Sequence, residues 1–135
     1  MDETISIVLF SGTDDKLHSA AVLAAGAAAL GRPVKILLQY WALEAFKAGN
    51  VAADHGLSAE ASEASSAAVA ARAGKGNWAE TLRQAKELGE VDIQACSLSM
   101  DVLKLEQSDL DSLVDGVEGV ASFYINAGEG QILFI

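Results

Sequence analysis

The chain contains one cysteine, Cys96, within the stretch Val91-Asp92-Ile93-Gln94-Ala95-Cys96-Ser97-Leu98-Ser99-Met100-Asp101. This pattern predicts a short apolar strand that runs directly into a helix. The first turn of a helix carries unpaired N–H groups and a partial positive charge, which favour the thiolate, the reactive form of cysteine. The hydroxyl groups of Ser97 and Ser99 stand where they could donate hydrogen bonds to the sulfur. Cys96 is therefore the candidate nucleophile; the alternative is a buried and inert thiol.

A second residue that could take part in cysteine chemistry is His18. It lies in the first turns of a helix expected over residues 14–30, directly after the first predicted strand. A histidine beside a cysteine accepts its proton and activates the sulfur. We predict that His18 approaches Cys96 across the edge of the sheet. The alternative is a half-exposed histidine with no role in catalysis.

The elements that must position these residues are strands that alternate with helices. Strands are expected over residues 4–10, 34–39 and 91–96, each followed by a helix. Polar or aromatic residues follow each strand, and the carboxyl ends of parallel strands share the edge where α/β proteins bind ligands. We therefore predict a substrate-binding site around Cys96, formed by Ser11, Gly12, Thr13, Tyr40, Trp41, Ser97 and Ser99. The alternative for Tyr40 and Trp41 is that they only cover the core.

The C-terminal part of the chain predicts a hairpin. Residues 117–125 and 131–135 are both apolar, and a short Gly-containing turn separates them, as in antiparallel hairpins. The fold class predicted from these patterns is an α/β layered sandwich. Its five-stranded sheet is mainly parallel, with an antiparallel C-terminal edge strand. Because an exposed apolar edge strand promotes association, we expect a homo-oligomer.

Length and composition predict a single domain over residues 1–135, of which 51% are hydrophobic. Residues 50–77 differ from the rest, because they are rich in Ala, Ser, Gly and Glu and contain few large apolar side chains. We predict that this segment is an insert or lid, with a loosely packed helix over about residues 58–73 and greater mobility than the sheet.

Several functional classes are disfavoured by the sequence. The 19 acidic and 9 basic residues give a net charge of −10, which repels nucleic acid. No apolar run reaches the roughly 18 residues that span a bilayer, and the acidic start is unlike a signal peptide, so we expect a cytoplasmic protein without membrane contact. His18 and His55 lack metal-ligand spacing. The turn at Ser11 lacks the lysine and the glycines of nucleotide-binding loops. No metal or cofactor is expected.

Four segments resemble a known family: residues 7–16, 27–31, 95–102 and 113–121. The most specific of them is Ala-Cys-Ser-Leu-Ser-Met-Asp-Val around Cys96. Together they resemble the DsrE/DsrF-like family of small sulfur-relay proteins, particularly its peroxiredoxin-like branch. The resemblance implies a flavodoxin-like three-layer sandwich and homo- or hetero-oligomeric assembly, such as a trimer or hexamer. It also implies that Cys96 carries sulfur as a persulfide between donor and acceptor proteins.

The sequence is thus compatible with three functions. The first is a sulfurtransferase that relays sulfane sulfur on Cys96. The second is a one-cysteine thiol peroxidase, in which Cys96 passes through a sulfenic acid; no arginine lies near Cys96 in the sequence to bind peroxide. The third is a non-catalytic oligomeric binding subunit with an inert Cys96.

Overall fold

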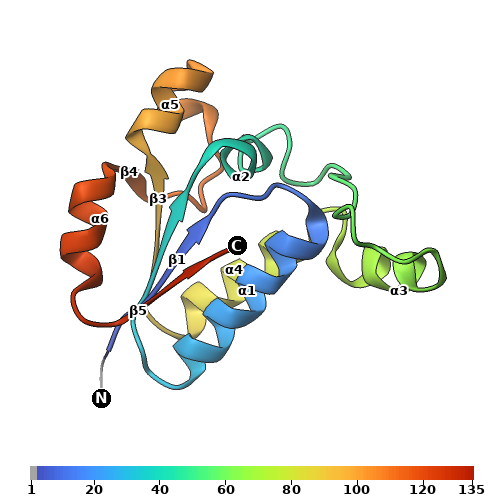
Figure 1. Cartoon of the computed structure of the whole chain (residues 1–135), viewed down its shortest axis with the longest axis horizontal. Helices are drawn as coiled ribbons and strands as arrows, with labels where there is room; N and C mark the ends of the chain where they lie inside the picture. The colour runs from blue at the N-terminus through green and yellow to red at the C-terminus, as the bar shows by residue number, and fades with distance from the viewer. Residues whose placement is uncertain (1–2) are drawn as a thin grey trace.

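The computed structural model describes residues 3–135 and contains one five-stranded sheet in the order β4-β3-β2-β1-β5 (Figure 1). Every pair of neighbouring strands is parallel. The strands are β1 (Ile5–Leu9), β2 (Val34–Leu38), β3 (Val91–Cys96), β4 (Gly116–Glu118) and β5 (Gln131–Phe134). The helices are α1 (Asp14–Ala29), α2 (Tyr40–Ala45), α3 (Glu63–Ala73), α4 (Asn77–Leu88), α5 (Ser97–Leu103) and α6 (Val120–Ala127), with a 3-10 turn at Gln107–Asp109. The predicted α/β class and five-stranded sheet are confirmed.

One face of the sheet carries the main core. Side chains alternate between the faces of a strand, so Ile5, Ile7 and Leu9 of β1 all point to this face, where α1 and α4 pack. Buried alanines on α1 let that helix lie close to the sheet, and Trp78 and Leu82 of α4 are fully buried. Burial of one side of each helix therefore fixes both helices on this face.

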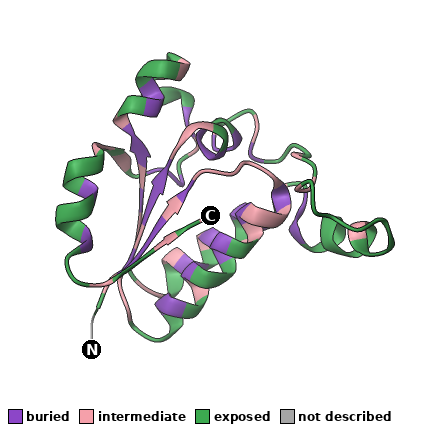
Figure 2. Cartoon of the chain, in the orientation of Figure 1, coloured by how far each residue is buried: buried purple, intermediate pink, exposed green. Residues whose placement is uncertain are grey.

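The opposite face is covered by α6, which lies over the side of the sheet that holds β3 and β4 (Figure 1). Phe123 of α6 packs with Leu37, Cys96 and Val8 in a small second core. At its β5 edge this face carries no helix, and β5 is coloured mainly as exposed in Figure 2. The three layers predicted for the fold are present, but the third layer is incomplete.

The predicted antiparallel C-terminal edge strand is wrong. Of the expected strand over 117–125, only Val117 and Glu118 belong to a strand, β4, and residues 120–127 form α6. The chain therefore does not turn back as a hairpin. It crosses from β4 at one edge of the sheet to β5 at the other, where Ser6 pairs with Ile132 and Val8 with Phe134 in parallel register. A helical crossover brings the chain back to the starting end of the sheet, so the next strand is parallel.

The segment over residues 50–77 contains one helix, α3, which is shorter than the predicted helix. Ala73 is its single buried residue, and the helix extends away from the sheet (Figure 1). The loop that precedes α3 is held to the start of α1 by two aspartates, Asp14 and Asp15. The Asp15 carboxylate accepts hydrogen bonds from the backbone N–H and the hydroxyl of Ser58, the latter at 2.6 Å.

Candidate functional site

Cys96 is the last residue of β3 and the N-cap residue of α5. The predicted junction of strand and helix is therefore present at this residue. Its side chain is 1% exposed, because Phe123 of α6 covers it and Leu37 and Val8 flank it. Cys96 thus stands at a helix start, as expected from the sequence, but its sulfur is shielded from solvent.

The hydrogen-bond donor to the sulfur comes from Gln39, the residue between β2 and α2, rather than from α5. The side-chain amide of Gln39 donates to Cys96 Sγ at an N···S distance of 3.8 Å. The Ser99 hydroxyl is buried and makes no hydrogen bond among the described residues. The Ser97 hydroxyl lies near Gly119, the N-cap residue of α6. An amide N–H directed at sulfur stabilises a thiolate more than a thiol, because a hydrogen bond to a charged acceptor is the stronger one.

A charged network lies beside Cys96 on the same face of the sheet. Cys96 and Glu118 are register partners on β3 and β4. One Glu118 oxygen accepts hydrogen bonds from Ser122 and Asn126 of α6, and the other is 3.8 Å from Lys35 Nζ. Lys35 also pairs with Asp92 at 2.8 Å. The network therefore attaches α6 to the sheet by polar contacts next to the sulfur.

The pKa of Asp92 is held below its ordinary value within this network. Burial alone would raise the pKa, but hydrogen bonds from Lys35 and Gln94 and the charge of Lys35 outweigh that effect. Asp92 is therefore ionised at neutral pH and keeps Lys35 in place.

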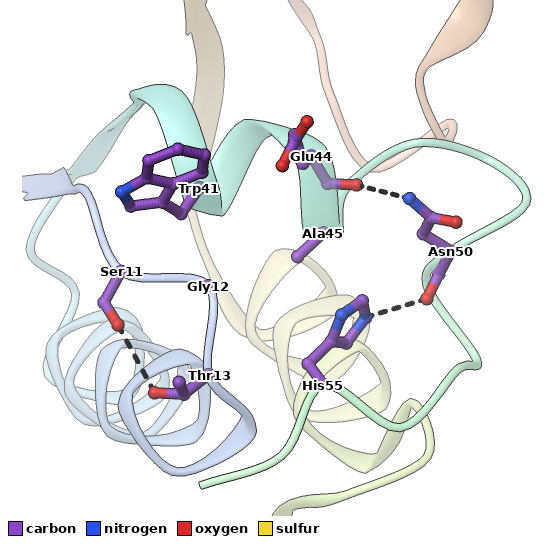
Figure 3. Close-up of a pocket in the computed structure, with 8 residues that line it drawn as sticks. All are labelled: Ser11, Gly12, Thr13, Trp41, Glu44, Ala45, Asn50 and His55. Atoms are coloured by element: carbon purple, nitrogen blue, oxygen red, sulfur yellow. Dashed lines mark hydrogen bonds between the residues drawn. The ribbon is translucent and has the colours of Figure 1, made fainter. Parts of the chain in front are cut away.

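Four of the predicted binding residues line a separate cavity of about 390 Å³ (Figure 3). Its lining residues are Ser11, Gly12, Thr13, Trp41, Glu44, Ala45, Asn50 and His55. The loop after β1 contributes one wall and α2 another. The structure thus brings Ser11, Gly12, Thr13 and Trp41 together, but Cys96 is not among the residues that line this cavity.

Two residues near the cavity, Gly12 and Tyr40, have constrained backbone geometry. A Cβ atom on Gly12 would collide with the carbonyl oxygen of Trp41, so glycine is required where the two walls meet. Tyr40 has a φ of 36°, a strained left-handed conformation for a residue with a side chain. The Tyr40 ring packs on Phe10 with centroids 5.8 Å apart, and Tyr40 is not among the cavity residues. The side chains of Tyr40 and Trp41 therefore belong to different environments.

His55 forms the far wall of the cavity through a fixed ring. Its Nε2 is 2.8 Å from the backbone oxygen of Asn50 (Figure 3). Since a carbonyl oxygen only accepts, Nε2 carries the proton of this hydrogen bond. The backbone N–H of His55 donates to Asp14, whose other oxygen accepts from Trp78 Nε1 at 3.2 Å. Asp14 thereby connects the cavity wall to the main core.

Burial raises the pKa of Asp14, and the hydrogen bonds from His55 and Trp78 only partly oppose this effect. Asp15 behaves in the opposite way. Burial would raise its pKa too, but the hydrogen bonds from Ser58 and other nearby groups hold that pKa below its ordinary value. The pKa values of these adjacent aspartates thus shift in opposite directions, because Asp14 is more deeply buried and hydrogen bonds offset the cost of burial only at Asp15.

The structure does not bring His18 and Cys96 together. His18 lies on α1, where it lines a surface hollow with residues of α3 and α4 such as Arg72 and Glu80. α1 packs on the face of the sheet opposite to Cys96. A Cys–His pair between these residues is therefore absent from the structure.

Sequence reasoning missed Gln39 and Glu118 near the sulfur and gave little weight to His55. Gln39 precedes the Tyr-Trp pair at the end of β2, a position that could have been recognised as sharing an edge with Cys96. Glu118 was not predicted as a neighbour of Cys96, because its strand was expected to be longer and to lead into a hairpin. Only the observed crossover places it beside Cys96.

Over residues 3–135, no group of three or more His, Cys, Asp or Glu residues is arranged to hold a metal ion. Within the same residues, no helix has the length and apolar character to cross a bilayer.

Comparison with known proteins places these observations in a family. Two solved structures share the fold. MTH1491 of Methanobacterium thermoautotrophicum, a protein of unknown function, superimposes with a TM-score of 0.58 and 12% sequence identity, and the match covers 99% of this chain and 100% of MTH1491. YchN of E. coli superimposes with a TM-score of 0.56 and 11% identity, and the match covers 100% of both chains. The uncharacterized protein YrkE of Bacillus subtilis (strain 168) is 29% identical over 153 aligned positions, which cover 96% of this chain and 95% of YrkE.

The sequence profile of one family matches residues 1–75, which include the loop after β1, all of α2 and the cavity residues. The match ends before Cys96, so it assigns no role to that residue. It covers more than half of the chain, and the resemblance seen in the sequence is confirmed: the chain belongs to the DsrE/DsrF/DrsH-like family.

Proposed function

We propose that the protein relays sulfane sulfur on Cys96. The observation that carries this proposal is the position of Cys96 at the start of α5, with the Gln39 amide directed at its sulfur. Membership of the DsrE/DsrF/DrsH-like family supports a sulfur-relay role in general. The partners of this relay are a sulfur donor protein and a sulfur acceptor protein, and the protein works as a homo-oligomer.

The proposed transfer consists of two balanced steps. In the first, the Cys96 thiolate attacks the outer sulfur of a donor persulfide, an S–S bond forms at Cys96, and the donor leaves as a thiolate. In the second, an acceptor thiolate attacks the outer sulfur on Cys96 and restores the Cys96 thiolate. Neither step needs an oxidant or a reductant. Gln39 stabilises the anionic sulfur before and after each transfer.

The relay requires that α6 opens, since Phe123 covers Cys96. α6 is suited to local opening because it is short and buries only Phe123 and Ala127. Glycines stand at both of its ends, at Gly119 and Gly128. A donor protein that displaces α6 gains access to the sulfur, and closure then protects the persulfide from other thiols.

The test is to incubate the protein with a polysulfide donor and to weigh it intact. We expect the native protein to gain one sulfur atom, which a reductant removes, and Cys96→Ser to gain none. Sulfur bound by the serine variant would contradict the assignment. Incubation with peroxide tests the peroxidase alternative, which requires a gain of one oxygen atom at Cys96 instead.

Gln39→Met provides the matched variant for the sulfur environment, because it approximates the length of the side chain and removes the N–H donor without adding a charge. A hydrogen bond to a charged group contributes about 1.5–3 kcal/mol. We therefore expect sulfur uptake by this variant to be at least about tenfold slower. An unchanged rate would show that Gln39 does not stabilise the reacting sulfur.

One observation favours a second candidate, a non-catalytic binding subunit that uses the cavity beside Trp41. The sulfur is almost fully buried, whereas this cavity is open to solvent. In that case the native protein takes up no sulfur, and Cys96 resists alkylation as long as the protein is folded.

A further inference from the structure

At the β5 edge, one face of the sheet lacks the helix that a parallel sheet normally carries on each face. Ile132 and Phe134 of β5 are register partners of Ser6 and Val8, so their side chains point to the same face as Val8, the face that α6 covers elsewhere. Ile132 is 42% and Phe134 70% exposed. We call this uncovered area the open half-face and define it by Phe10, Tyr40, Ile132 and Phe134.

The open half-face is a continuous apolar surface. The Phe10 ring lies 5.8 Å from the rings of both Tyr40 and Phe134, measured between centroids. No residue of β5 carries a charge. Contiguous exposed apolar surface of this kind is rare on a monomer and marks a contact with another surface.

The second unusual surface is the outside of α6. Tyr124 is 60% and Ile125 78% exposed, and α6 is coloured mainly as exposed in Figure 2. At 100° per residue, Ile125 points nearly opposite to the buried Phe123. α6 contains no charged residue, although the whole chain contains 28 of them (9 basic and 19 acidic). An apolar outer face on a surface helix indicates that a further partner packs on it.

We propose that α6 of one copy of this chain packs its outer face on the open half-face of the next copy. One surface lacks a helix and the other is a helix that lacks a partner. Their dimensions match, because eight helical residues are about 12 Å long and four strand residues about 13 Å.

Charge selects a second copy as the occupant of the open half-face. Two chains with a net charge of −10 repel each other over most of their surface. α6 and β5 are uncharged, so copies can meet there without bringing like charges together. Because the two surfaces differ, the contact is heterologous, and repetition of it builds a closed ring if the rotation between neighbouring copies closes and an open filament if it does not. This inference rests on the proposed homo-oligomer and adds the surfaces that form it.

The experiment is sedimentation velocity on the native chain and on two variants, Ile125→Lys and Phe134→Lys. Both side chains are exposed, so we expect both variants to keep the native circular dichroism spectrum. We expect the native chain to form an oligomer and each variant to be monomeric. An equal mixture of the variants should form a dimer, because the intact α6 of one fits the intact half-face of the other. Leu88→Lys, at an exposed apolar residue of α4, is the control and should sediment like the native chain.

Three outcomes would overturn the proposal. A monomeric native chain would remove the interface altogether. Loss of assembly in Phe134→Lys alone would mean that two β5 edges pair with each other, without α6. A mixture that stays monomeric would exclude the heterologous contact. Cys96→Ser should sediment like the native chain, so a failure of the sulfur relay leaves this result unaffected.

Discussion

At the scale of single residues, Asp14 is a buried carboxylate that connects three parts of the chain. It starts α1, accepts the indole N–H of Trp78 in the main core, and accepts the backbone N–H of His55 at the cavity wall. We expect Asp14→Ala to lower the free energy of unfolding by about 1–3 kcal/mol, because it leaves the buried Trp78 N–H without an acceptor. Urea unfolding measures this loss. The loss should be smaller in a Trp78→Phe background, where that donor is absent; an equal loss would show that the hydrogen bond is unimportant.

The raised pKa of Asp14 also predicts how stability depends on pH. Between the ordinary pKa of 3.8 and the raised one, the folded state binds the Asp14 proton more tightly than the unfolded state. The contribution of Asp14 is therefore greatest at acid pH and decreases as the pH rises through the raised pKa. Asp15 and Asp92, whose pKa values are lowered, act in the opposite direction, and their contributions are lost as the pH falls below 3.8.

Asp14→Asn separates these effects, because it keeps an acceptor oxygen and cannot titrate. We expect the difference in unfolding free energy between the native protein and this variant to shift in favour of the variant as the pH rises toward neutral. Urea titrations at several pH values measure that difference. A difference that does not change with pH would contradict the assignment of the raised pKa to Asp14.

At the scale of elements, the proposed relay requires α6 to open, because its Phe123 side chain packs against Cys96. We expect Phe123→Leu to speed the alkylation of Cys96 under native conditions, by about tenfold for each 1.4 kcal/mol by which local opening becomes easier. Phe46→Leu is the matched control, because Phe46 is equally buried but packs on Trp78 in the other core. Equal acceleration in both variants would mean that labelling proceeds through global unfolding rather than through movement of α6.

The elements also differ in how well the sequence predicts them. Residues 14–30 were expected to be helical, and α1 ends within one residue of that range because glycine and proline follow it. Residues 120–127 were misassigned because Val, Phe, Tyr and Ile all favour strands. Their helical state depends on tertiary contacts: Phe123 and Ala127, one helical turn apart, are the residues that α6 buries. Local propensity was overridden by the need to cover the face of the sheet around Cys96.

At the scale of the whole molecule, the net charge of −10 opposes the assembly inferred above. The Debye length falls from about 10 Å at 0.1 M salt to about 3 Å at 1 M, so salt screens the repulsion between copies. Because the proposed interface is uncharged, we expect the dissociation constant of the oligomer to decrease as salt is added. Sedimentation equilibrium over a range of salt concentrations measures it. Weaker assembly at high salt would indicate an interface held by ion pairs.

The sequence by itself determined the α/β class, the family, most of the strands and helices, and the position of Cys96 between a strand and a helix. These features depend on local signals: hydrophobic periodicity, glycine and proline at helix ends, and the motif around Cys96. The sequence also predicted that Ser11, Gly12, Thr13 and Trp41 lie close together, because the loops that follow β1 and β2 must share an edge of a parallel sheet.

Only the tertiary structure decided which face of the sheet each side chain occupies. It placed His18 and Cys96 on opposite faces, brought Gln39 and Glu118 beside the sulfur, and covered Cys96 with Phe123. These relations depend on strand order and on the direction of the chain after β4, which residues distant in sequence establish together. Side chains alternate between the two faces of each strand, but this alternation does not predict which face α6 will cover.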